Sequence, residues 1–213
     1  MSELISTGLC GPRISIPVDL QEIVEEFAAA MTTADSRRPT AVSPRSGRVY
    51  RPGIGPDPED RAVDLAMAEL GTARPQWNWQ LRACYPGSKQ TCDWLIGQPP
   101  EWAVEIKMAR PNGDNGKPDD TAIKDILSPY ASDRSAVTDC VKLAESALDC
   151  RRAILIYGFD DARRPLEQMI AAFEMLAGAR VRLGPRCQAT LGEMVHPVHR
   201  TGRVCAWEIR PIV

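Results

Sequence analysis

The sequence predicts an α/β fold in which a mixed central sheet is flanked by helices. Three short β-rich runs, at 76–84, 91–97 and 102–108, follow one another and are separated by turn-forming residues. A helical pattern at 135–148 then leads into the continuous apolar run at 154–159, which is typical of a fully buried central strand. With 213 residues, of which 44% are hydrophobic, the chain can bury one substantial core.

The N-terminal part of the chain divides into a helix and a polar segment. Residues 1–32 form a predicted N-terminal segment whose amphipathic helix begins after the N-cap Asp19. The apolar stripe of that helix comprises Leu20, Ile23, Val24, Phe27, Ala28 and Met31. Residues 33–56 are rich in Ser, Pro, Gly and Arg, which favours a basic flexible linker. Residues 57–213 are therefore expected to form the main domain.

A second helix is predicted to begin with Asp57 as its N-cap and Pro58 at its first position, and to end at Gly71. Its apolar face comprises Ala62, Val63, Ala66, Met67 and Leu70. At about 100° per residue, Glu59 falls near the centre of that apolar arc. Two interpretations stay open: Glu59 is a first-turn acid favoured by the helix dipole, or it is directed towards a site on the sheet.

The second and third β-rich runs carry charged residues at positions that indicate a site. In the third run, alternation places Glu105 and Lys107 on one face and Ile106 on the other. In the second run, Asp93 is expected to lie opposite a face formed by Cys92, Trp94 and Ile96. Burying a carboxylate and an ammonium on a core strand is costly without partners, which suggests the edge of a site. The alternative is a cross-strand ion pair on a solvated face, worth about a few tenths of a kcal/mol.

Asp93, Glu105 and Lys107, with eleven residues between the first two and one between the last two, resemble a known signature. It is the Asp…Glu-x-Lys pattern of the PD-(D/E)XK superfamily, the restriction-endonuclease-like nucleases. The resemblance covers about residues 57–159 and implies an αβββαβ core, with the N-terminal helix and a β-rich C-terminal extension lying outside it. It implies a nuclease that hydrolyses phosphodiester bonds of DNA. Mg²⁺ or Mn²⁺ would be held by Asp93, Glu105 and the carbonyl of Ile106, and Lys107 would orient or deprotonate the attacking water.

Two flanking positions extend the resemblance. Cys92 stands where the signature often has Pro, a position that is frequently replaced in the superfamily. Archaeal Holliday-junction resolvases, among other members, place a Glu on the helix before the sheet, about three helical turns ahead of a Gly and directed at the metal. Glu59 is close to that spacing from Gly71, and Asp60 matches it. Glu59 is therefore added to the catalytic candidates.

The charge distribution permits a DNA-facing side without requiring one. The formal net charge is −2, so no global basic field indicates nucleic-acid binding. The regions 37–51 and 180–210 are nevertheless locally basic. The alternative function is a non-catalytic nucleic-acid- or protein-binding module on the same fold. Nucleases of this superfamily often dimerise, so a homodimer is compatible with the resemblance, although no stretch of the sequence marks an interface.

Three acids follow the motif in a loop rich in Gly, Asn and Pro. Asp114, Asp119 and Asp120 could be drawn as further metal ligands, but a solvated loop is the favoured interpretation.

The C-terminal region, 181–213, is expected to add a β-rich extension with a turn that contains His196 and His199. Together with Cys187 and Cys205, these histidines could form a zinc site, and the imidazoles alone could contact phosphate. A plain hairpin is favoured, because a hairpin centred on this turn would pair Cys205 near Met194, far from Cys187.

The cysteines indicate a reducing compartment. The chain contains 7 of them, at irregular spacings and with no C-x-x-C pair. Cys140 and Cys205 fall within apolar patterns, as buried thiols do. Because the sequence shows no signal peptide and no long apolar run, we expect a cytoplasmic protein that does not enter a membrane.

Overall fold

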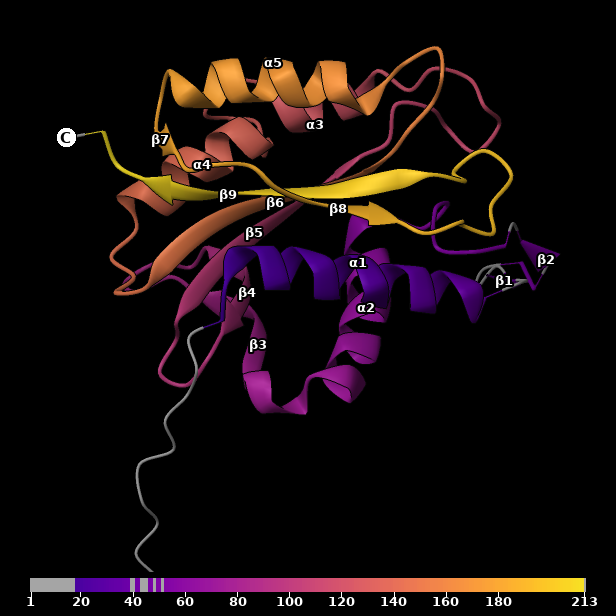
Figure 1. Ribbon diagram of the computed structural model, residues 1–213. Helices are drawn as coiled ribbons and strands as arrows, with labels where there is room; N and C mark the ends of the chain where they lie inside the picture. Colours follow the sequence, from indigo (N-terminus) through magenta and orange to yellow (C-terminus); the bar gives the residue numbers. More distant parts are fainter. Residues whose placement is uncertain (1–17, 39–40, 43–45, 48, 51, 213) are drawn as a thin grey trace, which may run out of the picture.

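The computed structural model describes residues 18–38, 41–42, 46–47, 49–50 and 52–212. It contains a central mixed sheet with helices on both faces (Figure 1). The strands of this sheet are β3 (Trp79–Cys84), β4 (Thr91–Ile96), β5 (Trp102–Ala109), β6 (Arg151–Phe159), β7 (Arg182–Leu183), β8 (Cys187–Leu191) and β9 (Gly202–Arg210). Their order is β3-β4-β5-β6-β9-β7, and β8 also pairs with β9. β5 and β6 are parallel, and the other neighbours are antiparallel.

Two helices cover one face of the sheet and three cover the other. On one face lie α1 (Leu20–Ser36) and α2 (Glu59–Ala73), and on the other lie α3 (Thr121–Leu127), α4 (Ala136–Glu145) and α5 (Leu166–Gly178) (Figure 1). β6 shows the alternation, because Leu155 faces α1 while Ile154 and Ile156 face α4 and α5. No helix among the described residues is long and apolar enough to span a lipid bilayer.

The predicted mixed sheet is confirmed, and its strands begin and end close to the predicted positions. Two strand starts differ by three residues: β6 was expected from residue 154 and begins at Arg151, and the first strand was expected from residue 76 and begins at Trp79. Pro75–Trp77 instead form a 3₁₀ turn, η1, and Asn78 takes a left-handed conformation after it. The turn buries Trp77 against Trp94, with 6.3 Å between the ring centroids. Packing of this indole therefore takes precedence over extending the strand.

α1 belongs to the main core, and the helix continues past residue 32, where the predicted N-terminal segment ends, to Ser36. Phe27 packs its ring 6.3 Å from that of Trp94 and 6.0 Å from that of Tyr157, between centroids. The N-terminal helix is thus one wall of the same hydrophobic core as the sheet.

The predicted linker, residues 33–56, is fastened to the core at both of its ends. Near its end, Ile54 is buried and its N–H donates to Asp35 Oδ1, 2.7 Å away. Asp35 Oδ2 accepts from the N–H of Val195, so one buried carboxylate joins α1, residue 54 and the β8–β9 connection. Between these ends, β1 (Ala41–Val42) and β2 (Val49–Tyr50) form a separate two-stranded sheet. The parts of the linker prediction at 39–40, 43–45, 48 and 51 lie outside the described residues.

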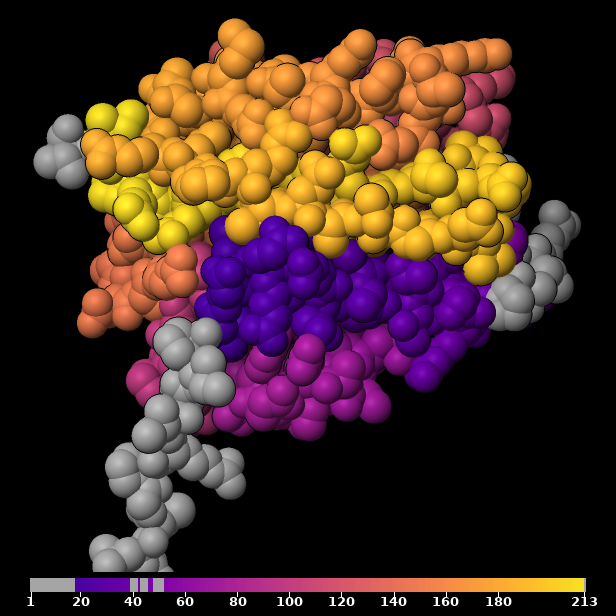
Figure 2. All heavy atoms as spheres, in the orientation of Figure 1, coloured from indigo at the N-terminus to yellow at the C-terminus, as the bar shows by residue number. Residues whose placement is uncertain are grey.

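Helix α1 lies along the outer strand β8 and takes up part of its hydrogen-bonding capacity (Figure 2). Gln21 Nε2 donates to the carbonyl of Gln188 over 3.1 Å, and Gln21 Oε1 accepts from the N–H of Gln188 over 3.2 Å. Further along, the N–H of Gly192 donates to Thr32 Oγ1 over 3.1 Å. Side chains of α1 thus cover an edge that would otherwise be open to another strand.

Candidate active site

The two motif strands part from each other at the predicted site. β4 and β5 are paired from Ile96↔Trp102 to Trp94↔Val104, whereas β5 and β6 stay paired along the whole of β5. Beyond Trp94, the N–H of Ile106 donates to Asp93 Oδ2 at 2.8 Å. A carboxylate of β4 therefore replaces a main-chain partner. Because the N–H and C=O of one residue in an extended strand point to the same side, the Ile106 carbonyl also points towards β4.

β4 changes face at this point, which corrects the expectation that Cys92 shares a face with Trp94 and Ile96. Trp94 packs in the core beneath α1, while Cys92 packs on the α4 side of the sheet. Arg82, between the paired residues Leu81 and Ala83 of β3, has a φ of 52°. The distortions at Arg82 of β3 and Asp93 of β4 coincide with a gap in the regular pairing of these two strands.

The parting of the strands opens into a cleft of about 1390 Å³. Its lining includes the predicted residues Glu59, Asp93, Glu105 and Lys107, so the fold brings all four side chains to one cavity. The far wall is formed by α4, which contributes Asp139 and Lys142 among others.

Glu105 is the most deeply buried acid in this cleft, with 1% of its surface exposed. Its Oε1 accepts a hydrogen bond from the hydroxyl of Tyr85 and lies 2.9 Å from Lys142 Nζ. Burial raises the pKa of Glu105 to about 8, with Asp93 and Asp139 adding to the rise and Lys142 opposing it. Burial also raises the pKa of Tyr85, which therefore stays a neutral donor.

Lys107 lies between two carboxylates from different helices. Its Nζ is 3.0 Å from Asp139 Oδ2 and 3.7 Å from Glu59 Oε1, and 14% of its side chain is exposed. Burial lowers the pKa of Lys107, but Glu59 and Asp139 outweigh this effect and the net pKa is raised. The side chain is therefore an ammonium and a hydrogen-bond donor, rather than a base.

Glu59 is directed at the sheet from the first turn of α2. Its Oε2 accepts from the main-chain N–H of Met108 on β5. Burial raises its pKa to about 7, although Lys107 and the bond from Met108 oppose the rise. α2 begins at Glu59 with Pro58 as N-cap, one residue later than expected, because the Asp57 side chain pairs with Arg38 instead of capping the helix.

The sequence did not identify Asp139, Lys142 or Tyr85 as site residues. Asp139 forms ion pairs with both lysines, since its Oδ1 is 2.9 Å from Lys142 Nζ and its Oδ2 is 3.0 Å from Lys107 Nζ. A signal was present: Asp139 is buried and adjoins the buried Cys140 on the face of α4 that packs on the sheet. An acid inside an apolar stripe, followed three residues later by a base, indicates a buried ion pair.

The acids of the 111–120 loop lie apart from the cleft. Asp114 Oδ1 is 3.4 Å from His199 Nε2 and 3.9 Å from Arg110, Asp119 accepts from the N–H of Thr121, and Asp120 lies 3.7 Å from Arg164. These contacts are those of an ordered loop, and none of the three acids lines the cleft.

The residues considered for zinc are not brought together. Cys205 pairs with Gln188 rather than lying near Met194, because the connection between β8 and β9 is longer than a simple hairpin turn. Cys187 and Cys205 consequently face opposite sides of the sheet. His196 and His199 are both 1% exposed and stack with 4.8 Å between their centroids, so their rings pack within the connection.

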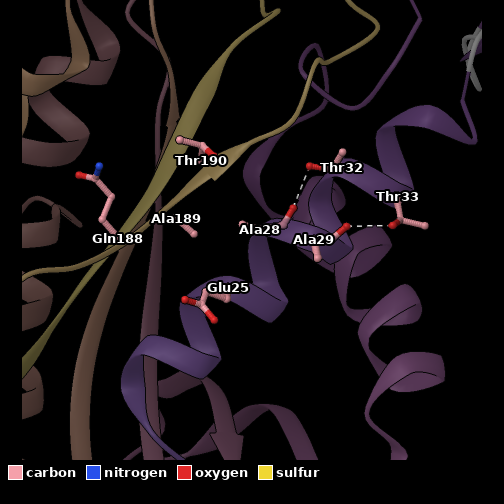
Figure 3. A pocket seen from close by; sticks show the side chains of 8 residues that line it. All are labelled: Glu25, Ala28, Ala29, Thr32, Thr33, Gln188, Ala189 and Thr190. Atoms are coloured by element: carbon pink, nitrogen blue, oxygen red, sulfur yellow. Dashed lines mark hydrogen bonds between the residues drawn. The ribbon is translucent and has the colours of Figure 1, made fainter.

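A second, shallower groove of about 660 Å³ lies between α1 and β8 (Figure 3). Its lining is Glu25, Ala28, Ala29, Thr32, Thr33, Gln188, Ala189 and Thr190. Thr32 and Thr33 each bond the carbonyl four residues earlier in α1. The groove contains none of the predicted site residues, and only one charged side chain lines it.

The donor set of the cleft fits a hard divalent cation in kind and in charge. Asp93, Glu105 and the Ile106 carbonyl offer oxygen ligands, which Mg²⁺ prefers. With Glu59 and Asp139, four acidic side chains face the ammonium groups of Lys107 and Lys142, and a cation would favour the ionised forms of Glu105 and Glu59, whose pKa values are raised by burial. No group of three or more His, Cys, Asp and Glu side chains that could hold a metal ion is found in the part of the chain that the structure describes. A cation would therefore depend on the main-chain carbonyl, water or substrate for further ligands.

Comparisons with protein-family models, with curated proteins and with solved structures find no match. The function is inferred from the residues of the cleft.

Proposed function

We propose that the protein is a divalent-metal-dependent nuclease that hydrolyses phosphodiester bonds of DNA. The observation that carries the proposal is the convergence of Asp93, Glu105 and Lys107 where β4 and β5 part, in an open cleft. The element order α2-β3-β4-β5-α4-β6 supports a restriction-endonuclease-like αβββαβ core, with α1 and the β7–β9 region as additions and α3 inserted before α4.

Each residue has a role that follows from its position. Asp93 and Glu105, with the carbonyl of Ile106, would hold Mg²⁺ or Mn²⁺. When bound, such an ion makes a bound water more acidic and screens the charge of the phosphate. Lys107 remains protonated, so it donates a hydrogen bond to the attacking water or to a phosphate oxygen and stabilises developing negative charge. Glu59 accepts from β5 and lies near the Lys107 ammonium, which it helps to hold in place.

The rim of the cleft carries exposed side chains of both charges, including the acids Asp60, Asp125 and Glu145 and four basic residues. Arg82, Lys89, Arg134 and Arg180 line the cleft, and all four residues are exposed. Basic side chains around an acidic, metal-holding centre would bind the phosphates on either side of the bond to be cleaved. A homodimer remains a prediction, which light scattering of the purified protein tests.

The second candidate function is a non-catalytic binding module. It is favoured by the linear chain of ion pairs Lys107–Asp139–Lys142–Glu105, which gives these buried charges partners without any chemistry.

The deciding experiment incubates supercoiled, linear and single-stranded DNA with the wild-type protein and Mg²⁺, Mn²⁺ or EDTA. Cleavage with the metals and none with EDTA is expected. Asp93→Asn should lose both cleavage and metal affinity, because an amide oxygen is a poorer ligand than a carboxylate. Asp149→Asn, a matched change at an exposed acid that does not line the cleft, should cleave like the wild type. DNA binding without cleavage would favour the binding module.

A further inference from the structure

Lys142 shares the carboxylate that the proposed cation needs. Its Nζ lies 2.9 Å from Glu105 Oε1 and 2.9 Å from Asp139 Oδ1. The oxygen of Glu105 that it contacts also accepts from Tyr85, so two donors already converge on the buried acid. Lys142 is outside the Asp93–Glu105–Lys107 motif and is supplied by α4.

The position of this ammonium is well defined by its surroundings. The Nζ of Lys142 lies 5.4 Å from the centroid of the Tyr85 ring, and 24% of the side chain is exposed. An ammonium is strongly hydrated, and the ring and the two carboxylates together compensate for the water that it gives up. The Lys142 ammonium thus occupies a position next to Glu105 that a metal cation would also occupy.

We propose that Lys142 competes with the divalent cation for Glu105, and that cation binding leaves Lys142 paired with Asp139 alone. This inference rests on the proposed function. Two positive charges within a few ångströms of one carboxylate repel each other strongly in a partly buried site. Asp139 already bonds Lys142 through Oδ1, three residues away on the same helix, so only the contact with Glu105 has to break. The lysine therefore lowers the affinity of the site for the divalent cation. Phosphate oxygens of the substrate would supply the additional ligands that the bound cation needs.

The test measures Mn²⁺ binding to the purified full chain by electron paramagnetic resonance and calorimetry, without DNA. Lys142→Met keeps much of the side-chain length and removes the charge, so it should bind Mn²⁺ about ten-fold or more tightly than the wild type. Lys142→Arg keeps the charge and should bind like the wild type. Lys117→Met, an exposed lysine that does not line the cleft, is the matched control and should change nothing.

A second readout follows Mg²⁺ binding in the wild type itself, and a variant is used only to assign the signal. Lysines are labelled by reductive ¹³C-methylation, and Lys142→Gln identifies the Lys142 signal. Mg²⁺ should shift that signal and leave the signal of Lys117 in place.

The outcomes separate this inference from the proposed function. If the wild type binds Mn²⁺ and cleaves DNA while Lys142→Met binds Mn²⁺ equally or more weakly, only the competition is overturned, and Lys142 is a positioning residue for Glu105. If neither protein binds Mn²⁺ and the wild type does not cleave, both proposals fail.

Discussion

The Nζ of Lys107 lies 3.0 Å from Oδ2 of Asp139, an acid that belongs to α4 and not to the β-strand motif. The lysine at the centre of the proposed chemistry is therefore held from the opposite wall of the cleft. The position of Lys107 on β5 therefore depends on the placement of α4.

Lys107→Ala should abolish DNA cleavage while leaving the fold and Mn²⁺ binding largely intact. Lys107 shares the cleft with Glu105 but is not a metal ligand, so its removal takes away charge stabilisation and not the cation. The expected loss of kcat is about a hundred-fold or more. Plasmid cleavage, circular dichroism and Mn²⁺ titration measure the three properties. Lys117→Ala is the control, and equal cleavage by Lys107→Ala and wild type would exclude the catalytic role.

Asp139→Asn should lower kcat more than it changes KM, because Asp139 positions Lys107 and does not contact the substrate. A neutral amide holds an ammonium less firmly, so a loss of about ten-fold is expected. Steady-state kinetics on a fluorescent DNA substrate separate the two constants. Asp139→Glu should restore part of the rate, and an increase in KM alone would instead place Asp139 in substrate binding.

Stability should fall as pH rises from about 5 to 8. Burial, followed by Asp93 and Asp139, raises the pKa of Glu105 from 4.5 to about 8. The folded chain keeps a proton on Glu105 in a range where the unfolded chain has lost it, so stability from this group is complete below pH 4.5 and is lost through pH 8. Urea unfolding across this range measures the slope.

Glu105→Gln cannot titrate and should have a shallower slope, while Glu25→Gln on the exposed face of α1 should keep the wild-type slope. Mg²⁺ should also flatten the wild-type slope, because it favours the ionised carboxylate. A Glu105→Gln slope equal to that of the wild type would contradict the assignment.

Asp35→Ala should reduce the free energy of unfolding by about 3 kcal/mol. The change leaves the N–H groups of Ile54 and Val195 without their carboxylate acceptor, and Ile54 is fully buried. Ser36→Ala, next to it but exposed, should stay within about 0.5 kcal/mol of the wild type. Urea denaturation measures the free energy of unfolding of both variants. Equal effects of the two changes would show that the Asp35 carboxylate does not stabilise the contacts of α1 with Ile54 and Val195.

Local patterns predicted those parts of the site that lie on one strand. Glu105 and Lys107 both line the cleft. Residues that are two positions apart on a strand always share a face, so the sequence alone predicts that these two side chains lie together. Glu59 lines it too, since its helical phase placed it on the apolar arc. Asp139 and Lys142 were missed because their role depends on how α4 lies over β5, and no local pattern specifies that packing.

The same reason explains the errors in the fold. Side-chain alternation cannot predict that β4 changes face at Asp93, because the change accompanies the parting from β5. The packing of α1 on the sheet was not predicted because the ring contacts of Phe27 with Trp94 and Tyr157 join residues far apart in the sequence. The pairing of Cys205 was misjudged because the length of a loop is not encoded in strand patterns.

The contacts of Gln21 and Thr32 with β8 limit how two copies of the protein could share one continuous sheet. Lateral growth past β8 would require α1 to give up these bonds, whereas β3 lies at the opposite edge of the sheet. β3 borders the cleft, to which it contributes Arg82. A second copy that extended the sheet at β3 would therefore lie beside the cleft.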